Sequence, residues 1–297
     1  MISEQNLSAV DLQILSACAP PDANTNCVLT AVRYHLAAGG NRLRARFCLE
    51  ASQSLGIDAL NGLTLAAICE SLHNASLIQD DLLDRASVRR NQGSVWAVFG
   101  DATAVCAGDL LLAGASGLVG ELTDLEFMKP ALSLVTRRTQ EVILGQGEER
   151  LFVMNDLESY ELLAAGKSAS LLSLPLELPL LLSGNVKFCQ SAQHATKAFA
   201  VAYQMLDDLA DYDEDMRNNS PNAVTAALAL GSSDFRSACS TVCSRADALM
   251  QSAIDDARQL PMNCAAAMIA YAERARLTLS TREKQGMRPV EEMLHGA

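Results

Sequence analysis

The sequence of 297 residues predicts an all-α fold. Ala, Leu, Ser and Asp dominate its composition, and only 8 prolines and 17 glycines interrupt it. Apolar residues recur at positions i, i+3, i+4 and i+7, a spacing that lines one face of a helix. The hydrophobic share is 49% and the net charge is −12, from 35 acidic and 23 basic residues. These values are typical of a globular chain with a substantial core, and they exclude a disordered or collagen-like chain.

The predicted helices lie between stretches rich in glycine, proline or asparagine, which favour turns. The first, 45–54, lies between the Gly39-Gly40 turn and Gly56, and the second, 63–83, runs toward a break at 89–93. Pro130 separates the predicted helices 102–118 and 132–151. The predicted helix 192–212 lies between breaks at 184–185 and 218–222. Pro261 separates the last two predicted helices, 232–258 and 264–284. Because no linker-like stretch divides the chain, we expect a single all-helical domain over residues 1–297.

Composition also excludes several classes of protein. The nine cysteines form no C-x-x-C pair, so neither a disulfide framework nor a zinc site is indicated. A pI of about 4.8 argues against nucleic-acid binding. The apolar stretch 171–182 contains Glu177 and two prolines and is too short to span a membrane, so we expect no transmembrane segment. No basic residue precedes Arg33 and no clean apolar run opens the chain, so we expect no signal peptide and a cytoplasmic location.

Two D-D-x-x-D sequences each end an apolar helical stretch. They are residues 80–84 and 207–211. Residues i and i+4 share a helix face, so Asp80 pairs with Asp84 and Asp207 pairs with Asp211. Like charges at this spacing destabilise a helix, above all at its negative C-terminal end, so a cation must offset them.

The ion that suits these carboxylates is Mg²⁺, which prefers oxygen ligands and commonly completes its shell with water and substrate phosphates. Calcium is less favoured, because the loop ligands and central glycine of an EF-hand are missing. One acidic cluster by itself is equally well explained as a solvated helix end. Two clusters on two apolar helices favour a metal site.

Arginines near the first cluster are suited to bind a phosphate group. Arg85, Arg89 and Arg90 follow the cluster, and Arg42 and Arg44 follow the Gly39-Gly40 turn. The planar guanidinium binds phosphate oxygens with two parallel hydrogen bonds. Either group alone is most simply a solvated face, but beside the aspartate clusters both favour a magnesium and phosphate site.

Further motifs occur in a fixed order along most of the chain. They are Gly39 to Arg44, the stretch 70–84, Arg89-Arg90, 99–111, Gly145-Gln146, Lys167-Ser168 and 203–208. In this order they resemble the motifs of the trans-isoprenyl diphosphate synthases, the polyprenyl synthetase family that makes geranyl, farnesyl and longer diphosphates.

The resemblance implies a helical bundle of the isoprenoid-synthase type around a central cavity, usually a homodimer, with the aspartate clusters facing across the cavity and three Mg²⁺ ions between them. It implies a Mg²⁺-dependent prenyltransferase that condenses an allylic diphosphate with the homoallylic isopentenyl diphosphate. The implied catalytic residues are Asp80, Asp81, Asp84, Arg89, Lys167, Asp207 and Asp208, and the implied metal ligands are Asp80, Asp84, Asp207 and Asp211. The implied substrate-binding residues are Arg42, Arg44, His73, Arg89, Arg90, Lys167, Ser168 and Gln204.

Departures from the family pattern leave the acceptor open. Asn41 stands where the family has a lysine that contacts isopentenyl diphosphate, and 212–224 contains Arg217 but none of the lysines that the family has there. One charged hydrogen bond contributes about 1.5–3 kcal/mol, so the homoallylic site is expected to be weakened. Three hypotheses follow: a chain-elongating synthase, a relative that ionises an allylic diphosphate for cyclisation, irregular coupling or hydrolysis, and a non-catalytic partner subunit. The intact aspartate clusters argue against the last.

The residues just before the first cluster predict product length, because in this family the growing chain runs beside this helix. Ala75 and Ser76 are small where short-chain enzymes often carry an aromatic ring. The next wall on this face lies one to two turns deeper, near Leu72 and Ile68, about 5 to 10 Å away. We therefore expect a farnesyl or geranylgeranyl product, unless a bulky residue from another helix, such as Phe99 or Met154, fills the space.

Overall fold

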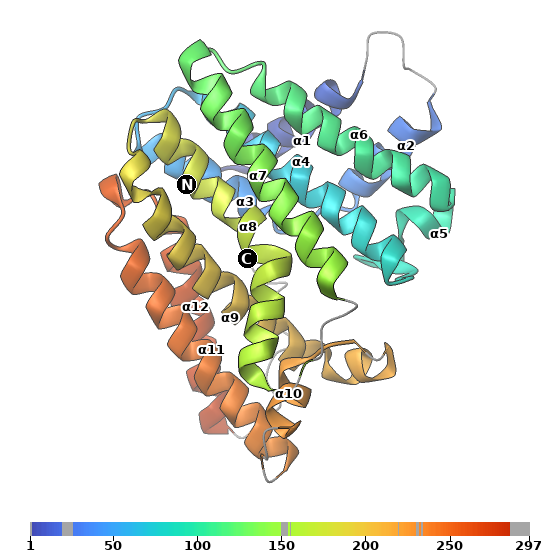
Figure 1. The fold of residues 1–297 in the computed structure, drawn as a ribbon, viewed down its shortest axis with the longest axis vertical. Helices are drawn as coiled ribbons and strands as arrows, with labels where there is room; N and C mark the ends of the chain where they lie inside the picture. Colours follow the sequence, from blue (N-terminus) through green and yellow to red (C-terminus); the bar gives the residue numbers. More distant parts are fainter. Residues whose placement is uncertain are drawn as a thin grey trace. The chain divides into compact units, whose positions relative to one another are not determined.

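The computed structural model describes residues 2–19, 26–149, 154, 156–218, 220–229, 232 and 234–285, and α-helices dominate them (Figure 1). The helices are α1 (Glu4–Cys18), α2 (Cys27–Ala37), α3 (Leu43–Ser54), α4 (Ala59–Leu83), α5 (Val95–Phe99), α6 (Asp101–Val119), α7 (Leu125–Glu149), α8 (Leu157–Leu182), α9 (Cys189–Asn218), α10 (Ala223–Ala229), α11 (Phe235–Ala257) and α12 (Ala266–Gln285). Two 3₁₀ turns, η1 (Val186–Phe188) and η2 (Pro261–Asn263), and the short strands β1 (Val88–Arg89) and β2 (Gln92–Gly93) connect them. The predicted all-α class is confirmed.

Each helix predicted from periodicity has a counterpart in α3, α4, α6, α7, α9, α11 or α12, although α7 begins seven residues earlier and α9 ends six residues later than predicted. The end of the predicted 132–151 helix lies outside the described residues. The break predicted at Pro130 was wrong, because Pro130 lies inside α7. Helix α8 likewise contains Pro175 and Pro179, although the sequence analysis predicted no helix there. A proline inside a helix costs about 3 kcal/mol, so burial of the apolar side chains of α8 must outweigh this cost.

The chain divides into two compact units, each described here by itself. Unit 1 comprises Met1–Arg137 and Leu174–Val186, and unit 2 comprises Arg138–Ser173 and Lys187–Ala297. The expectation of a single domain stays a prediction.

Helix α4 is the central helix of unit 1. Asp58 caps its start by accepting hydrogen bonds from the N–H groups of Leu60 and Asn61, at 3.1 and 3.0 Å. The helix packs against α1, α3, α5 and α6, and fully buried Leu65, Ile68 and Ile78 lie along it. This burial on several sides extends α4 without a break to the first aspartate cluster.

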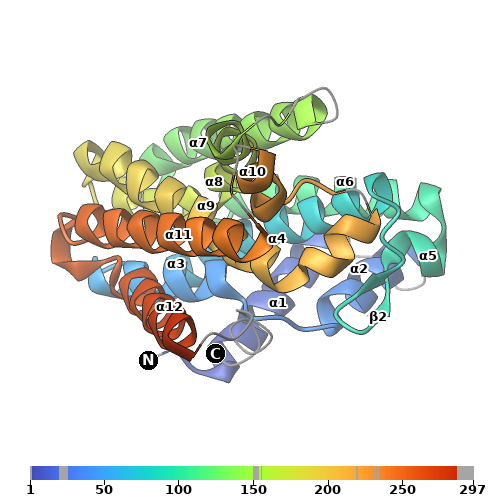
Figure 2. The same cartoon turned by 90° about the horizontal axis from the view of Figure 1, so that it is seen from below.

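Helices α9, α10, α11 and α12 pack together in unit 2 (Figures 1 and 2). Phe199 of α9 is fully buried and lies in aromatic contact with Tyr203 and Tyr271, at centroid distances of 6.2 and 5.7 Å. This packing fixes the part of α9 that precedes the second aspartate cluster.

One described helix, α6, is long and apolar enough to cross a membrane, judged by length and composition. The same helix packs against α1, α2, α4 and α5, and 44% of its apolar stretch is buried. Its features are those of a core helix as much as of a membrane span.

Candidate active site

The first aspartate cluster ends helix α4 in unit 1. Asp84 is the C-cap, and its N–H donates to the carbonyl oxygen of Asp80 at 2.9 Å. The side chain of Asp80 is half-buried and that of Asp84 is exposed, whereas Asp81 is only 1% exposed. The first and last aspartates thus differ from the middle one in their access to a ligand.

Asp81 is held by an arginine of the hairpin that follows. The Nε–H of Arg89 donates to both carboxylate oxygens of Asp81, at 2.7 and 2.8 Å, and Nη2 lies 2.7 Å from Oδ1. Burial raises the pKa of Asp81, and the Arg89 guanidinium opposes this rise. Both oxygens of Asp81 are thus engaged by Arg89, and its predicted catalytic role stays a prediction.

The hairpin carries the paired arginines. Strands β1 and β2 pair Val88 with Gly93 and Arg89 with Gln92, so Arg90 and Asn91 form a two-residue tip. Both tip residues have positive φ, 52° and 62°, as in the type I′ turn that two-residue hairpins favour. The sequence analysis predicted only a break here.

Two other arginines are engaged elsewhere. Arg42 is buried, with its guanidinium donating to Asp11 Oδ2 at 2.8 Å and to the carbonyl oxygens of Leu36 and Gly39 at 2.9 Å. Arg85 donates to both oxygens of Asp101 at 2.9 Å. These contacts favour a structural role for Arg42, and its predicted substrate contact stays a prediction.

Arg44 lies in the first turn of α3, beside a buried carboxylate of α4. Glu70 is 1% exposed, and its Oε1 accepts the N–H of Ala45 at 2.9 Å. The N-cap residue of α3, Arg42, makes no capping hydrogen bond with its side chain. Glu70 therefore supplies an acceptor for one of the backbone N–H groups that are left without a partner in the first turn of a helix. This bond attaches the first turn of α3, which carries the half-buried Arg44, to α4.

Two histidines lie among these arginines in their neutral form. Burial, then Arg44, Arg90 and Arg89, lower the pKa of His73 well below its usual range. Burial and nearby arginines lower the pKa of His35 to about 3, and its Nε2 lies 3.1 Å from Asn74 Oδ1. The sequence predicted a functional position for His73 but not for His35. The signal that could have identified His35 is that it is a polar residue on the buried face of α2.

The second aspartate cluster lies on α9 in unit 2 and repeats the pattern of the first. Asp207 is half-buried and Asp211 is exposed, whereas Asp208 is 3% exposed. Asp208 accepts hydrogen bonds from Gln204 Nε2 at 2.9 Å and from the N–H of Ala223 at 2.7 Å. The middle aspartate is again held by contacts within the protein, here with Gln204 and Ala223. The predicted catalytic role of Asp208 and the predicted substrate contact of Gln204 stay predictions.

Burial and neighbouring carboxylates both act on Asp207. Burial, followed by the negative charges of Asp208, Asp211 and Asp215, raises the pKa of Asp207 well above its usual range. Burial raises the pKa of Asp208 to about 6, against the effect of its hydrogen bonds. A bound cation would relieve this repulsion.

Asn222 lies in the segment 212–224, where the family pattern has lysines. Asn222 is fully buried, and its Nδ2 donates to the Asp208 carbonyl oxygen and to Asp215 Oδ2, both at 2.8 Å. Its Oδ1 accepts the N–H of Val224 at 2.8 Å and so caps α10. Asn222 joins the end of α9 to α10 without contributing a charge.

Lys167 and Ser168 lie on α8, close to α7. A Cβ atom added at Gly145 of α7 would lie 2.6 Å from the carbonyl oxygen of Gly166, so the two helices approach backbone to backbone there. Ser168 Oγ donates to the Ala164 carbonyl oxygen within its own helix, at 3.0 Å. The predicted roles of both residues toward substrate stay predictions.

The predicted chain-length residues are packed into unit 1. Ala75, Leu72 and Ile68 are buried, and the half-buried Ser76 donates its hydroxyl to the His73 carbonyl oxygen at 2.9 Å. The Phe99 ring contacts the Tyr34 ring edge to face, at 5.3 Å between centroids. Their influence on product length stays a prediction.

The donor set of the two clusters suits magnesium. Within the described part of the chain, no three His, Cys, Asp or Glu side chains gather closely enough to hold a metal by themselves. Carboxylate pairs of this kind bind Mg²⁺ only when water or phosphate oxygens complete the shell. The half-buried position of Asp207 among the negative charges of Asp208, Asp211 and Asp215 fits such an ion.

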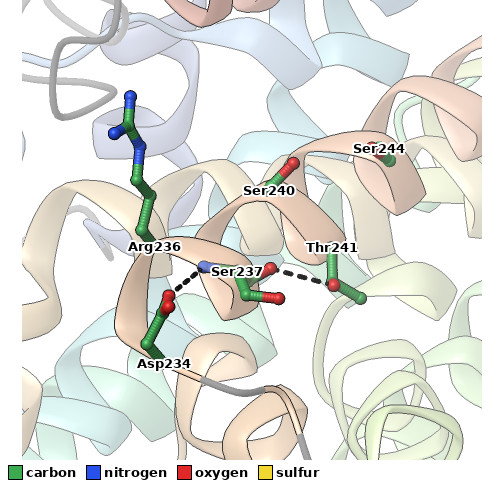
Figure 3. Close-up of a pocket in the computed structure, with 6 residues that line it drawn as sticks. All are labelled: Asp234, Arg236, Ser237, Ser240, Thr241 and Ser244. Atoms are coloured by element: carbon green, nitrogen blue, oxygen red, sulfur yellow. Dashed lines mark hydrogen bonds between the residues drawn. The ribbon is translucent and has the colours of Figure 1, made fainter.

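An open depression lies at the start of α11 in unit 2 (Figure 3). Its lining residues are Asp234, Arg236, Ser237, Ser240, Thr241 and Ser244. Asp234 Oδ1 accepts the N–H of Ser237 at 2.8 Å and so caps the helix (Figure 3). None of the predicted catalytic residues lines this depression.

Comparison with known proteins identifies the family. The model of the polyprenyl synthetase family matches residues 25–224. An octaprenyl diphosphate synthase of Haemophilus influenzae is 31% identical over 185 residues, which cover 60% of this chain and 54% of the relative. A (2E,6E)-farnesyl diphosphate synthase of Mycobacterium bovis is 32% identical over 174 residues, covering 57% and 48%. The chain thus spans about half the length of the curated relatives it matches.

A solved structure shows the same fold. It is the crystal structure of a polyprenyl synthase from Caulobacter crescentus complexed with calcium and isoprenyl diphosphate, with a TM-score of 0.78 and 22% identity, covering 92% of this chain and 94% of that one. The family match extends over more than half of the sequence and includes both aspartate clusters. The chain therefore belongs to the polyprenyl synthetase family.

Proposed function

We propose that this protein is a prenyltransferase that condenses an allylic diphosphate with isopentenyl diphosphate to form a trans-polyprenyl diphosphate. The observation that carries the proposal is the contact between Asp81 and Arg89 at 2.7 Å, because it joins the carboxylate cluster to the paired arginines at the end of α4. Carboxylates for a cation and guanidiniums for a diphosphate are the two groups that this reaction needs at one place.

Magnesium is the proposed cofactor, with Asp80, Asp84, Asp207 and Asp211 as its ligands. When bound, it would neutralise charge on the diphosphate oxygens as the leaving group departs. The raised pKa of Asp207 supports a cation at the second cluster. The calcium in the Caulobacter crescentus structure supports a divalent ion in this family, and three ions, as the resemblance implies, are part of the proposal.

The cationic side chains have separate tasks. Arg89, held by Asp81, and Lys167 stabilise the negative charge that develops on the allylic diphosphate. Arg44 and Arg90 bind the diphosphate of the isopentenyl substrate. His73, kept neutral by burial and the arginines, is suited to donate an N–H to the same diphosphate without adding a charge. The proton lost after coupling goes to the released diphosphate.

The proposed product is farnesyl or geranylgeranyl diphosphate. The small side chains of Ala75 and Ser76 support a product longer than geranyl diphosphate. The farnesyl and octaprenyl names of the two relatives bracket a wide range of lengths, so the residues before the first cluster carry this part of the proposal.

The proposed assembly is a homodimer formed through α6. One face of α6 packs inside unit 1, while the opposite face exposes mostly small or apolar residues. The small or apolar ones are Ala102, Val105, Cys106, Ala113, Ser116 and Gly117, and the exposed charged residues of the helix are Asp101 and Asp109. Covering an apolar helix face is the usual reason for association of two copies. Light scattering on the purified protein tests this assembly.

A second function has its own support. Asn41 carries no charge, and the buried Asn222 anchors the segment where the family pattern has lysines, so positive charge around the substrates is reduced. An enzyme that ionises an allylic diphosphate and then cyclises, couples irregularly or hydrolyses it would need fewer such charges.

One experiment separates these functions. Purified protein with Mg²⁺ is incubated with dimethylallyl, geranyl or farnesyl diphosphate, each with and without isopentenyl diphosphate. Products that require isopentenyl diphosphate support the synthase. Products formed without it support the second function. No product under any condition would refute both and favour a non-catalytic partner subunit.

A further inference from the structure

The Gly39-Gly40 turn and the arginine hairpin are built against each other in unit 1. Arg90 Nη1 donates to the carbonyl oxygen of Gly39. A Cβ atom added at Gly40 would lie 2.6 Å from Arg90 Cζ and 2.7 Å from Nη2. Non-bonded carbon atoms prefer separations of about 3.5–4.0 Å, so the guanidinium fills the space of any side chain at this position. A side chain at Gly40 would therefore displace the Arg90 guanidinium, and the φ of +128° is one that residues with a side chain rarely adopt.

Tyr34 of α2 fastens the second strand of the hairpin. Its hydroxyl donates to the Gly93 carbonyl oxygen at 2.9 Å, and its own carbonyl oxygen accepts from Gln92 Nε2 at 3.2 Å. Its ring also contacts Phe99 edge to face. Because Gln92 follows the two-residue tip directly, Tyr34 holds the strand on which the position of Arg90 depends.

The hairpin tip needs such support. Arg90 has a φ of 52°, a left-handed conformation that costs a non-glycine residue about 1–2 kcal/mol. Burial, followed by the positive charges of Arg42 and Arg89, lowers the pKa of Arg90, and the carboxylates of Glu70 and Asp81 oppose this shift. A residue with a strained backbone and a buried charge keeps its position only when surrounding contacts hold it, and such strain clusters at functional sites.

We propose that Tyr34 and Gly40 are positioning residues that hold the hairpin tip, and with it the Arg90 guanidinium, ready for the diphosphate of the second substrate. The identity of that diphosphate rests on the proposed function. The positioning itself requires only that an anion binds at Arg90.

The test uses two conservative variants with matched controls. Tyr34→Phe removes the hydroxyl that binds the hairpin, and Thr30→Val removes a hydroxyl on the same helix that donates only to the Asn26 carbonyl oxygen. Gly40→Ala places a methyl group against Arg90, and Gly56→Ala places one at another positive φ, +74°, with nothing within 4 Å.

Two readouts are compared. The first is the KM for isopentenyl diphosphate against the kcat and the KM for the allylic diphosphate. The second is calorimetric binding of inorganic pyrophosphate to the full chain in EDTA, which needs no turnover. We expect Tyr34→Phe and Gly40→Ala to raise the KM for isopentenyl diphosphate, and to weaken pyrophosphate binding, by about tenfold each, the effect of about 1.4 kcal/mol. We expect kcat, the allylic KM and both controls to change less than about twofold.

The two proposals fail in different ways. If no condensation occurs but pyrophosphate binding weakens only in Tyr34→Phe and Gly40→Ala, the proposed function is wrong and the positioning role stands. If condensation occurs while both variants retain the wild-type KM and pyrophosphate affinity, the positioning role is overturned. An equal loss in Gly40→Ala and Gly56→Ala would also overturn the role of Gly40, because Arg90 would then not be the cause.

Discussion

The adjacent residues Asp80 and Asp81 are expected to respond in opposite ways to the same substitution. Asp81→Asn removes the charge that binds Arg89 through contacts of 2.7 and 2.8 Å. Breaking a buried ion pair costs about 3–5 kcal/mol. Two features reduce this value: the Arg89 side chain is 31% exposed and can be solvated, and the raised pKa of Asp81 shows that its buried charge is itself costly. We expect a loss of about 2 kcal/mol in the free energy of unfolding.

The expected effect on rate is a separate quantity, the loss of transition-state stabilisation by Arg89. If Arg89 acts on the leaving diphosphate only when Asp81 holds it, about 2 kcal/mol of transition-state stabilisation corresponds to about a 30-fold lower kcat. Asp80→Asn removes a proposed metal ligand instead. It relieves repulsion with Asp84, so apo stability holds or rises, while turnover falls by about a thousandfold or more.

The assays are urea unfolding in EDTA and steady-state turnover with Mg²⁺. Asp101→Asn is the control, because it breaks an exposed ion pair, with Arg85, that contributes little. Equal stability of the wild type and Asp81→Asn would refute the assignment of Asp81 as the residue that holds Arg89. Equal losses of turnover in Asp80→Asn and Asp81→Asn would show that Asp81 is itself a metal ligand.

The other predictions concern the acceptor, the product and pH. Asn41→Lys is expected to lower the KM for isopentenyl diphosphate severalfold, because it adds a cation near Arg44; an unchanged KM in a folded variant favours the second function. Ala75→Phe is expected to shorten the product and, because Ala75 is 0% exposed, to cost about 1–3 kcal/mol of stability through overpacking; chromatography of dephosphorylated products checks this, and an unchanged length distribution contradicts it. Asp208 has its pKa raised to about 6 from 3.8, so its stabilising contribution is complete below about pH 3.8 and is lost as pH rises through 6. In EDTA we expect wild-type stability to fall by up to about 3 kcal/mol across this window relative to Asp208→Asn, at 1.36 kcal/mol per pH unit; urea titrations at several pH values measure it, and a rise would contradict the assignment.

Local patterns in the sequence were sufficient to predict much of the fold. The helices α4 and α9 were predicted because apolar side chains repeat along them at helical spacing, a property of each segment alone. Helix α8 was missed because its prolines cost local hydrogen bonds, while the burial that compensates for them comes from other helices. The two-residue hairpin was missed because Arg90-Asn91 is an unusual tip, stabilised by contacts with Tyr34 and Gly39 from a distant segment.

The sequence by itself determined which residues could carry the chemistry: the two carboxylate pairs, the paired arginines and their order along an all-helical chain. Their spacing is local, so the residue list follows from the helical repeat. Only the tertiary structure decided how those residues are used. The side chains of Asp81 and Asp208 are buried in the fold. Arg42 donates a hydrogen bond to Asp11, 31 residues away in the sequence. These are contacts between side chains far apart in the sequence, and they depend on packing that no single segment encodes.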